Sequence, residues 1–505
     1  MLGRTFRYIA FVSLFGLPLL LAPTAEVQSE SCGSRSNNTY DKLLECVTVD
    51  GAAVHLEALQ QIADAHNGNR ASGTSGYDAS AEYAVGVLTA SGYNVSVQPF
   101  QFQTFLTLQP TLLERVSPPP AGSVASSTLQ YSGSGDVTAP VSVPSGFPGG
   151  CSASDFAGFT PGHIALLMRT PNCFFSVKAT NAFNAGAVGV IFYNNAPGTL
   201  EGTLGSNFSL NIPVVGVTAA DGLALRSTPG LVMRIRTSTF RGTATSYNII
   251  AETASGDPES VVMAGAHLDS VFTSPGVQDN GSGAAAILEV AKHIAKANLR
   301  NKVRFALWGA EEVGLAGSNA YLLSLPQAEQ DKIVLYLNFD MIASPNHGFF
   351  IYDGDDSDAV GAGPGPEGSA QIERTFEAFY TSRDIPVRGT DFTGRSDYGP
   401  FISLGIPSGG IFTGADGIKT VEETELWGGT AGIPYDPCYH KPCDTYANIN
   451  ITAMDTNIDA VAYAVLRFAM NTEDVNGTRP KGNFPIEAGV SITSSPDLHE
   501  HDAVY

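Results

Sequence analysis

The stretch that decides the fold is VVMAGAHLDSVFTSPGVQDNGSGAAAILEVAKHIAKANLRNKVRFALWGAEE, residues 261–312. It opens with the apolar run Val261–Ala266 and ends just after a second apolar run, Val303–Trp308. Between them, Ser282–Ala297 places its apolar residues on one face of a helix. Runs of this kind are typical of strands in a sheet that is covered on both faces. With a third run, Ile333–Phe339, they predict an α/β fold: a mixed, mostly parallel central sheet flanked by helices.

Ionisable side chains follow these runs at the points where the strands end. His267 and Asp269 follow the first run, Glu311 and Glu312 follow the second, and Asp340 ends the third. Because ligands bind at the carboxyl ends of the strands in α/β sheets, we expect these side chains to share one edge of the sheet. Imidazole and carboxylate groups together suit zinc.

Each of these residues also has a simpler interpretation. Asp279, in the loop before the helix, is equally suited to making a turn or to capping the helix. Glu311 and Glu312 also fit a solvated helix start, and a histidine after a strand is more often structural than a ligand. Asp340 taken alone is the strongest indication of a metal site, because a charge at the end of an apolar strand must be paired or solvated. The convergence of all of them on one sheet edge favours a metal site.

Five separated motifs carry a more specific signal. They are GAHLDS (265–270), DNGSGAAA (279–286), WGAEEVGLAGS (308–318), NFDMI (338–342) and YHKPCDT (439–445). In this order they resemble peptidase family M28, and especially its secreted di-zinc aminopeptidases. Residues 69–100 resemble the N-terminal segment of that family. GHIALLMRT (162–170) and AFNAGAVGVIFYNN (182–195) resemble the protease-associated domain that several members carry as an insert.

The resemblance implies two Zn²⁺ per chain and names their ligands position by position. Asp279 would bridge both ions. His267 and Asp340 would complete one site, and Glu312 and His440 would complete the other. His440 rests on the resemblance alone, because it lies far beyond the last strand that we can predict.

The resemblance also assigns roles to residues that do not bind the metal. Glu311 would be the general base, Tyr439 would help to hold the developing oxyanion, and Asp269 would orient the first imidazole. The chemistry agrees, because a water shared by two zinc ions has its pKa lowered towards neutral. One glutamate must then stay off the metal to take and return the proton. Lys441-Pro442 stands where relatives commonly have Gln-Ala, a change at the loop rim that touches no ligand.

The expected function is a metallo-exopeptidase that hydrolyses the N-terminal peptide bond of peptides or proteins with free N-termini. A carboxypeptidase and a single-zinc glutaminyl cyclase are the enzyme alternatives, although the full set of five ligands speaks against the cyclase. A non-catalytic binding protein on this fold would be expected to have lost ligands. GRSDYGPF (394–401) resembles a family segment near the substrate pocket, so Asp397 and Tyr398 are candidates for the pocket rim, with a structural turn as the alternative.

Composition and the N-terminus limit the partners and the compartment. The 49 acidic and 27 basic residues give a net charge of −22, which argues against nucleic acid or an anionic membrane as the main partner. Arg4 and Arg7 precede an apolar run, Ile9–Leu21, that is typical of a secretory signal peptide and too short to span a bilayer comfortably. We therefore expect a secreted, extracellular monomer without stable membrane insertion.

Six cysteines and several glycosylation sequons fit an oxidising compartment. Proximity along the chain suggests the pairs Cys32–Cys46, Cys151–Cys173 and Cys438–Cys443, although the sequence alone allows other pairings. The third pair would stiffen the loop that carries Tyr439 and His440. Glycans are expected at Asn37, Asn94, Asn207, Asn450 and Asn476, whereas the sequon at Asn280 lies in the expected active site and should stay bare.

The predicted domain organisation follows from changes in residue composition and apolar pattern along the chain. We expect a signal peptide (1–25), the first part of the peptidase domain (26–115), a small β-rich protease-associated insert (116–240), the catalytic part (241–475) and a tail (476–505). The breaker cluster Ser117–Pro120 marks the first boundary of the insert. Five histidines have no motif support and are expected to be structural or at the surface: His55, His66, His163, His293 and His347.

Overall fold

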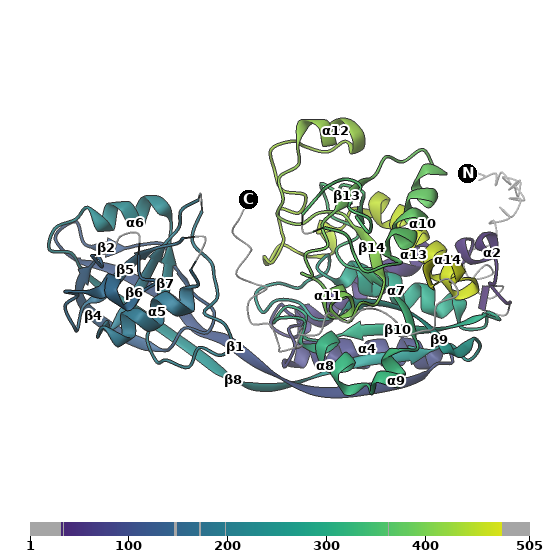
Figure 1. Cartoon of the computed structure of the whole chain (residues 1–505), viewed down its shortest axis with the longest axis horizontal. Coiled ribbons are helices and arrows are strands. Elements are labelled where there is room, and N and C mark those ends of the chain that lie inside the picture. The colour runs from purple at the N-terminus through teal and green to yellow at the C-terminus, as the bar shows by residue number, and fades with distance from the viewer. Residues whose placement is uncertain are drawn as a thin grey trace, which may run out of the picture.

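Two lobes joined by a long antiparallel ribbon make up the chain in its computed structural model, which describes residues 32–33, 35–145, 149–170, 173–196, 198–361 and 363–476 (Figure 1). The ribbon consists of β1 (Asn94–Ser117) and β8 (Val232–Glu252), paired from Asn94 opposite Glu252 to Ser117 opposite Val232. The signal peptide expected over residues 1–25 and the tail beyond residue 476 lie outside the described residues.

The larger lobe is built on the predicted sheet, whose strand order is β13-β12-β14-β11-β9-β10-β8. The strands after β8 are β9 (Asp257–His267), β10 (Asn301–Trp308), β11 (Ile333–Phe339), β12 (Phe350–Tyr352), β13 (Arg388–Thr390) and β14 (Ser408–Phe412). The four central strands β14, β11, β9 and β10 are parallel, whereas β8 pairs antiparallel with β10 and β12 with β14. The prediction of a mixed, mostly parallel sheet is confirmed.

Helices cover both faces of this sheet. The first face carries α3 (Val49–Ala65), α4 (Ser75–Ala90), α7 (Gly281–Ile294), α10 (Ser369–Thr381) and α13 (Ile451–Met470), whose apolar residues form one core with β9, β10 and β11. The second face carries α8 (Ala316–Ser324) and α11 (Tyr398–Ser403), packed around the fully buried Trp308. All of α7 except Lys292 is buried, which explains why this helix is rich in Gly and Ala. The short elements of this lobe are α2 (Tyr40–Leu44), α9 (Gln327–Gln330), α12 (Val421–Trp427), η2 (Tyr446–Asn448) and α14 (Glu473–Asn476).

The smaller lobe is the predicted insert. Its sheet continues from β8 in the order β4-β5-β6-β7-β3, with a separate apolar core on each face. Its elements are β2 (Gly122–Ser123), β3 (Ser127–Thr128), β4 (Gly135–Ser142), η1 (Ala153–Phe156), β5 (Ile164–Met168), α5 (Phe175–Asn184), β6 (Gly189–Tyr193), β7 (Val214–Val217) and α6 (Ala219–Arg226). The expected boundaries at 115/116 and 240/241 fall inside β1 and β8, because both strands are shared by the two lobes.

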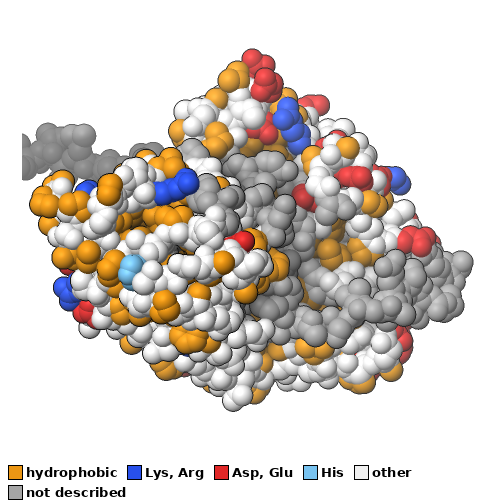
Figure 2. Space-filling model, turned by 60° about the vertical axis from the view of Figure 1, so that its left-hand side comes forward, with side chains coloured by type: hydrophobic (Ala, Val, Ile, Leu, Met, Phe, Trp, Pro, Cys, Tyr) orange, Lys and Arg blue, Asp and Glu red, His pale blue; other side chains and the backbone are white. Residues whose placement is uncertain are grey.

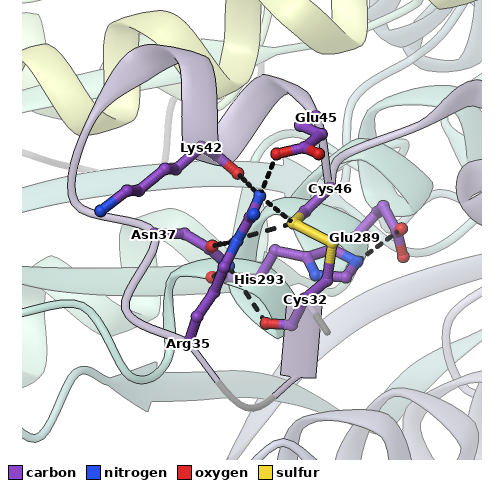
Figure 3. Close-up of a disulfide and its surroundings, with 8 residues drawn as sticks. All are labelled: Cys32, Arg35, Asn37, Lys42, Glu45, Cys46, Glu289 and His293. Atoms are coloured by element: carbon purple, nitrogen blue, oxygen red, sulfur yellow. Dashed lines mark hydrogen bonds and ion pairs between the residues drawn. A yellow bond between two sulfur atoms is a disulfide. The ribbon is translucent and has the colours of Figure 1, made fainter. Parts of the chain in front are cut away.

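The disulfide Cys32–Cys46 closes the N-terminal segment on itself beside α7 (Figure 3). Beside it, the Asn37 side chain is 1% exposed, and its Nδ2 donates to the His293 carbonyl at 2.8 Å. His293 in turn contacts the buried Glu289 of the same helix, with 2.9 Å between Nε2 and Oε1. The burial and the hydrogen bond of the Asn37 amide argue against the glycan expected at this position.

The other cysteines and sequons are placed as follows. Cys151 pairs with Cys173 and Cys438 with Cys443, so the three disulfides are the pairs that proximity along the chain suggested. Asn94 and Asn207 are exposed, whereas Asn280 is fully buried. Asn450 is half-buried and caps α13, accepting the Ala453 N–H at 3.0 Å. The side chain of Asn476 lies outside the described residues.

The outer face of the insert mixes hydrophobic and polar side chains, with few charges in the view of Figure 2. The exposed hydrophobic residues of its helices and their flanks are Phe174, Val177, Phe183 and Leu223. Among the described residues, none of the helices combines the length and the apolar character needed to cross a membrane.

His347 makes the stability of the larger lobe sensitive to acid. Its Nδ1 lies 3.1 Å from the Nδ2 of Asn450, and burial, followed by nearby Lys419, lowers the pKa of His347 to about 4 from a normal value of 6.5. Well above pH 6.5 the imidazole is neutral in the folded and unfolded chains alike and contributes no pH dependence. Between pH 6.5 and 4 the unfolded chain binds a proton that the folded chain excludes, so stability falls as the pH falls.

The expected loss of unfolding free energy due to His347 is about 1–2 kcal/mol between pH 7 and pH 5. His347→Gln should remove this part of the acid sensitivity. Urea titrations of chelator-treated protein at both pH values would measure it. Tryptophan fluorescence reports on the larger lobe, because both tryptophans of the chain, Trp308 and Trp427, lie there. His66→Gln, at the C-cap of α3, is the control and should keep the wild-type difference. An unchanged difference in His347→Gln would contradict the assignment.

Candidate metal centre

The predicted strand-end residues meet at the carboxyl edge of the central sheet. His267 is the last residue of β9, Asp340 directly follows β11, and Glu311 and Glu312 lie in the loop after β10. Asp279 comes from the loop that leads into α7. His440 comes from the loop closed by the disulfide Cys438–Cys443. It does not follow a strand of the sheet, and only the motif pointed to it.

The two oxygens of Asp279 face two different groups of side chains. The Nε2 of His267 lies 3.3 Å from Asp279 Oδ1 and 3.3 Å from Asp340 Oδ1. The Nε2 of His440 lies 3.1 Å from Asp279 Oδ2 and 3.1 Å from Glu312 Oε2. The cluster therefore divides into two neighbouring sets of three, with Asp279 common to both.

The cluster fits bound divalent cations. Glu312 Oε1 and Asp340 Oδ1 are buried and have no hydrogen-bond partner. Burial, together with neighbouring carboxylates, raises the pKa of Glu311 well above its usual range and that of Glu312 to about 7. Burial by itself lowers the pKa of His267, but Asp340 and Glu311 outweigh it and raise that pKa. So much buried negative charge needs a cation, and a set of imidazoles and carboxylates suits zinc.

Glu311 faces the same space from slightly farther away. Its Oε2 lies 3.9 Å from His267 Nε2, and its side chain is 9% exposed. The Glu311 backbone N–H donates to Asp269 Oδ1 at 3.2 Å. The Nδ1 of His267 is 3.1 Å from the Asp269 carbonyl and 3.6 Å from its carboxylate. Asp269 therefore contacts both His267 and the backbone of Glu311, which suits the predicted orienting role.

Tyr439 and His440 are stacked at the open side of the cluster, with ring centroids 3.8 Å apart. The side chain of His440 is 34% exposed, whereas those of the other metal-ligating candidates are 15% exposed or less. His440 is thus the ligand nearest to solvent and belongs to a surface loop. Thr273 Oγ1 donates to its carbonyl at 3.3 Å.

Two buried residues that sequence reasoning did not single out hold the ligand loops. The carboxylate of Asp444 accepts the N–H groups of Gln278 at 2.8 Å and Asp279 at 3.1 Å. The guanidinium of Arg70 donates to the carbonyls of Leu268, Pro275 and Gly276. Both residues lie inside the family motifs, but a motif does not reveal that the partners are backbone groups.

A chain of buried hydrogen bonds that starts at Tyr336 of β11 fixes one carboxylate oxygen of Asp340. Tyr336 donates to Asn338 at 3.0 Å, Asn338 to Ser396 at 2.9 Å, and the Ser396 hydroxyl to Asp340 Oδ2 at 2.6 Å. This leaves Asp340 Oδ1 turned towards His267. Ser396 was also not singled out from the sequence.

Asp397 and Tyr398, for which a place at the pocket rim and a structural turn were both open, are buried. Asp397 is 1% exposed and Tyr398 is 2% exposed. Asp397 stands at the start of α11, and burial raises its pKa to about 8. Tyr398 packs against Tyr352 and Phe392, and its hydroxyl accepts the Gly394 N–H at 3.0 Å. The alternative of a structural turn describes this segment better, because its side chains fill the second face of the sheet.

Comparison with known proteins matches both lobes. The sequence model described as "Peptidase family M28" matches residues 248–465, and that of the "PA domain" matches residues 137–225. The chain is 45% identical over 449 residues to an aminopeptidase of Pseudomonas aeruginosa (strain UCBPP-PA14), covering 86% of this chain and 83% of that protein.

Solved structures show the same architecture. An aminopeptidase from Aneurinibacillus sp. strain AM-1 is 27% identical with a TM-score of 0.69, covering 86% of this chain and 96% of the other. A zinc aminopeptidase from Bacillus subtilis is 25% identical with a TM-score of 0.62, covering 87% of this chain and 98% of the other. The likeness extends over both lobes and the ribbon between them.

Proposed function

Since the chain belongs to peptidase family M28, we propose that it is a secreted zinc aminopeptidase that removes N-terminal residues from peptides and proteins. The observation that carries the proposal is the placement of the Asp279 carboxylate: one of its oxygens faces His267 and the other faces His440. One carboxylate placed between two imidazoles is an arrangement that suits a pair of metal ions. The zinc aminopeptidase with the same fold supports zinc as the metal.

Each chain would hold two Zn²⁺. His267 and Asp340 would complete one site, Glu312 and His440 the other, and Asp279 would be shared by both. When bound, the ions would lower the pKa of a shared water and polarise the scissile carbonyl. Glu311, which faces the cluster without being needed as a ligand, would take the proton of that water and return it to the leaving amine.

The relatives favour a free N-terminus over a C-terminus as the end that is cleaved. The protein of Pseudomonas aeruginosa that is 45% identical over 449 residues and the Bacillus subtilis protein with the same fold are both aminopeptidases. Tyr439, beside His440 at the open side, would help to hold the oxyanion. The three disulfides support a secreted location.

A panel of aminoacyl chromogenic substrates tests this function. Activity should disappear with a chelator and return with zinc. A peptide with a free N-terminus should be cleaved, and its N-acetylated twin should not. Cleavage of the acetylated peptide from its C-terminus would establish the carboxypeptidase instead. Ring closure of an N-terminal glutamine without peptide cleavage would establish the cyclase. Two bound zinc ions with no turnover of any peptide would point to a binding protein.

A further inference from the structure

One buried carboxylate joins the loop of His440 to the loop of Asp279. Asp444 is fully buried and lies four positions after His440. Its two carboxylate oxygens accept the backbone N–H groups of Gln278 at 2.8 Å and Asp279 at 3.1 Å. Its backbone carbonyl accepts the N–H of Val277 at 3.2 Å. Two loops far apart in the sequence are thereby held together directly beside the carboxylate shared by both metal sites.

The Asp279 loop has other supports besides Asp444. Arg70 donates to the Pro275 and Gly276 carbonyls before it. After it, Asn280 Nδ2 donates to the Phe339 carbonyl at 2.9 Å, and Ser282 Oγ donates to the Gln278 carbonyl at 2.8 Å. These bonds connect the loop to the sheet and to α7, so Asp279 should keep its place when Asp444 changes.

The His440 loop depends more on Asp444. His440 is partly exposed and has a φ of 57°, in the left-handed region that non-glycine residues rarely adopt. The disulfide Cys438–Cys443 closes this loop on itself and does not attach it to the sheet. Besides the bond from the Thr273 hydroxyl to the His440 carbonyl at 3.3 Å, the link from Asp444 to residues 277–279 sets where His440 lies relative to Asp279.

We propose that Asp444 is a positioning residue for the metal site formed by His440, Glu312 and Asp279. This inference rests on the proposed function. Asp444→Asn keeps the side-chain shape but turns an amide NH₂ towards one of the two backbone N–H groups. The zinc affinity of the His440 site should fall about 10–100-fold, the usual cost of losing a group that orients a ligand. The site with His267 and Asp340 should keep its affinity.

Zinc titrations of chelator-treated protein, by calorimetry and by competition with a chromophoric chelator, measure both sites without relying on activity. The wild type should bind two ions tightly, and Asp444→Asn one tightly and one weakly. His440→Ala removes a ligand of the affected site and should leave one tight ion. If Asp444 acts through His440, adding Asp444→Asn to His440→Ala should not weaken that ion.

Asp436 provides a matched control in the same loop. It is 1% exposed and accepts the Cys438 N–H at 2.8 Å and the Asn448 Nδ2 at 3.0 Å. Within the described chain, these side-chain bonds do not run to residues 277–279. Asn448 Nδ2 also donates to Asp444 at 3.3 Å, so Asp436→Asn disturbs the surroundings of Asp444 without touching its bonds to residues 277–279. Asp436→Asn should therefore bind two ions with wild-type affinity. Equal weakening by Asp436→Asn would mean that general loosening of the loop is responsible, and this would overturn the proposal.

Three further outcomes would also overturn it. Two ions bound tightly by Asp444→Asn would show that the link is dispensable. Loss of both ions, or of the folded state, would show that the carboxylate serves the whole fold. The proposed function fails separately: a wild type that binds fewer than two ions or cleaves no peptide refutes that function whatever the variant does.

Discussion

Replacing Glu311 by glutamine is expected to lower kcat about a thousandfold, the scale of a lost general base, while both zinc ions remain bound. Glutamine has nearly the shape of glutamate but cannot accept the proton of the attacking water. The bond from the Glu311 backbone to Asp269 is unaffected by the change, so the loop should keep its conformation. Steady-state kinetics on a chromogenic substrate, with zinc measured by mass spectrometry on the same sample, checks both parts.

The neighbouring glutamate is the matched control. Glu312 Oε2 lies 3.1 Å from His440 Nε2, and its other oxygen is buried without a partner. Glu312→Gln should therefore lose zinc as well as activity. If Glu311→Gln lost zinc and Glu312→Gln kept it, the roles of the two residues would be exchanged. Nearly normal turnover in Glu311→Gln would remove it from the proton transfer altogether.

The part of the site that follows from strand logic was predictable from the sequence. His267, Glu312 and Asp340 follow apolar runs, and parallel strands bring their carboxyl ends to one edge of a sheet. Asp279 lies in the loop between two of these elements. His440 was different, because its position depends on contacts such as those of Asp444 with residues 277–279. Motif resemblance named His440, but no local pattern places it.

The sequence was less informative wherever backbone groups are the partners. Arg70 and Asp444 bind carbonyls and amides, which every residue carries, so no spacing of side chains identifies their contacts. A similar limit applies to β1, in which only Val95–Phe102 shows the alternation of a strand. The strand continues to Ser117 because β8 pairs with it, although much of its second half is exposed and lacks alternation. Asn37 carried a sequon, but tertiary packing decides that its amide is buried.

Removing the charge of Arg70 is expected to destabilise the larger lobe strongly. Arg70 is fully buried, and its guanidinium serves the carbonyls of Leu268, Pro275 and Gly276. Burial lowers the pKa of Arg70 to about 10, but the nearby Asp269, Asp444 and Asp279 favour its charged form. Arg70→Met would leave the buried carbonyls of Leu268 and Pro275 without donors, whereas the Gly276 carbonyl would still accept the Gly281 N–H at 3.0 Å. It would also leave three carboxylates without their cation. The expected loss is about 3–5 kcal/mol, as for other broken buried ion pairs.

Denaturant unfolding of chelator-treated protein, followed by tryptophan fluorescence, measures this loss. The unfolding free energy of Arg70→Lys should lie between those of the wild type and Arg70→Met. An ammonium group keeps the charge but cannot reach three carbonyls in the fixed geometry of a guanidinium. Arg374→Met is the surface control: Arg374 contacts the Asp355 carboxylate at 3.0 Å with its side chain 62% exposed, so no measurable change is expected. Zinc should recover part of the stability of Arg70→Met, since the ions bind only the folded cluster and replace some of the missing positive charge. An Arg70→Met protein as stable as the wild type would mean that the carbonyls of the 268–276 loop find other donors, and that the loop presenting Asp279 does not depend on this cation.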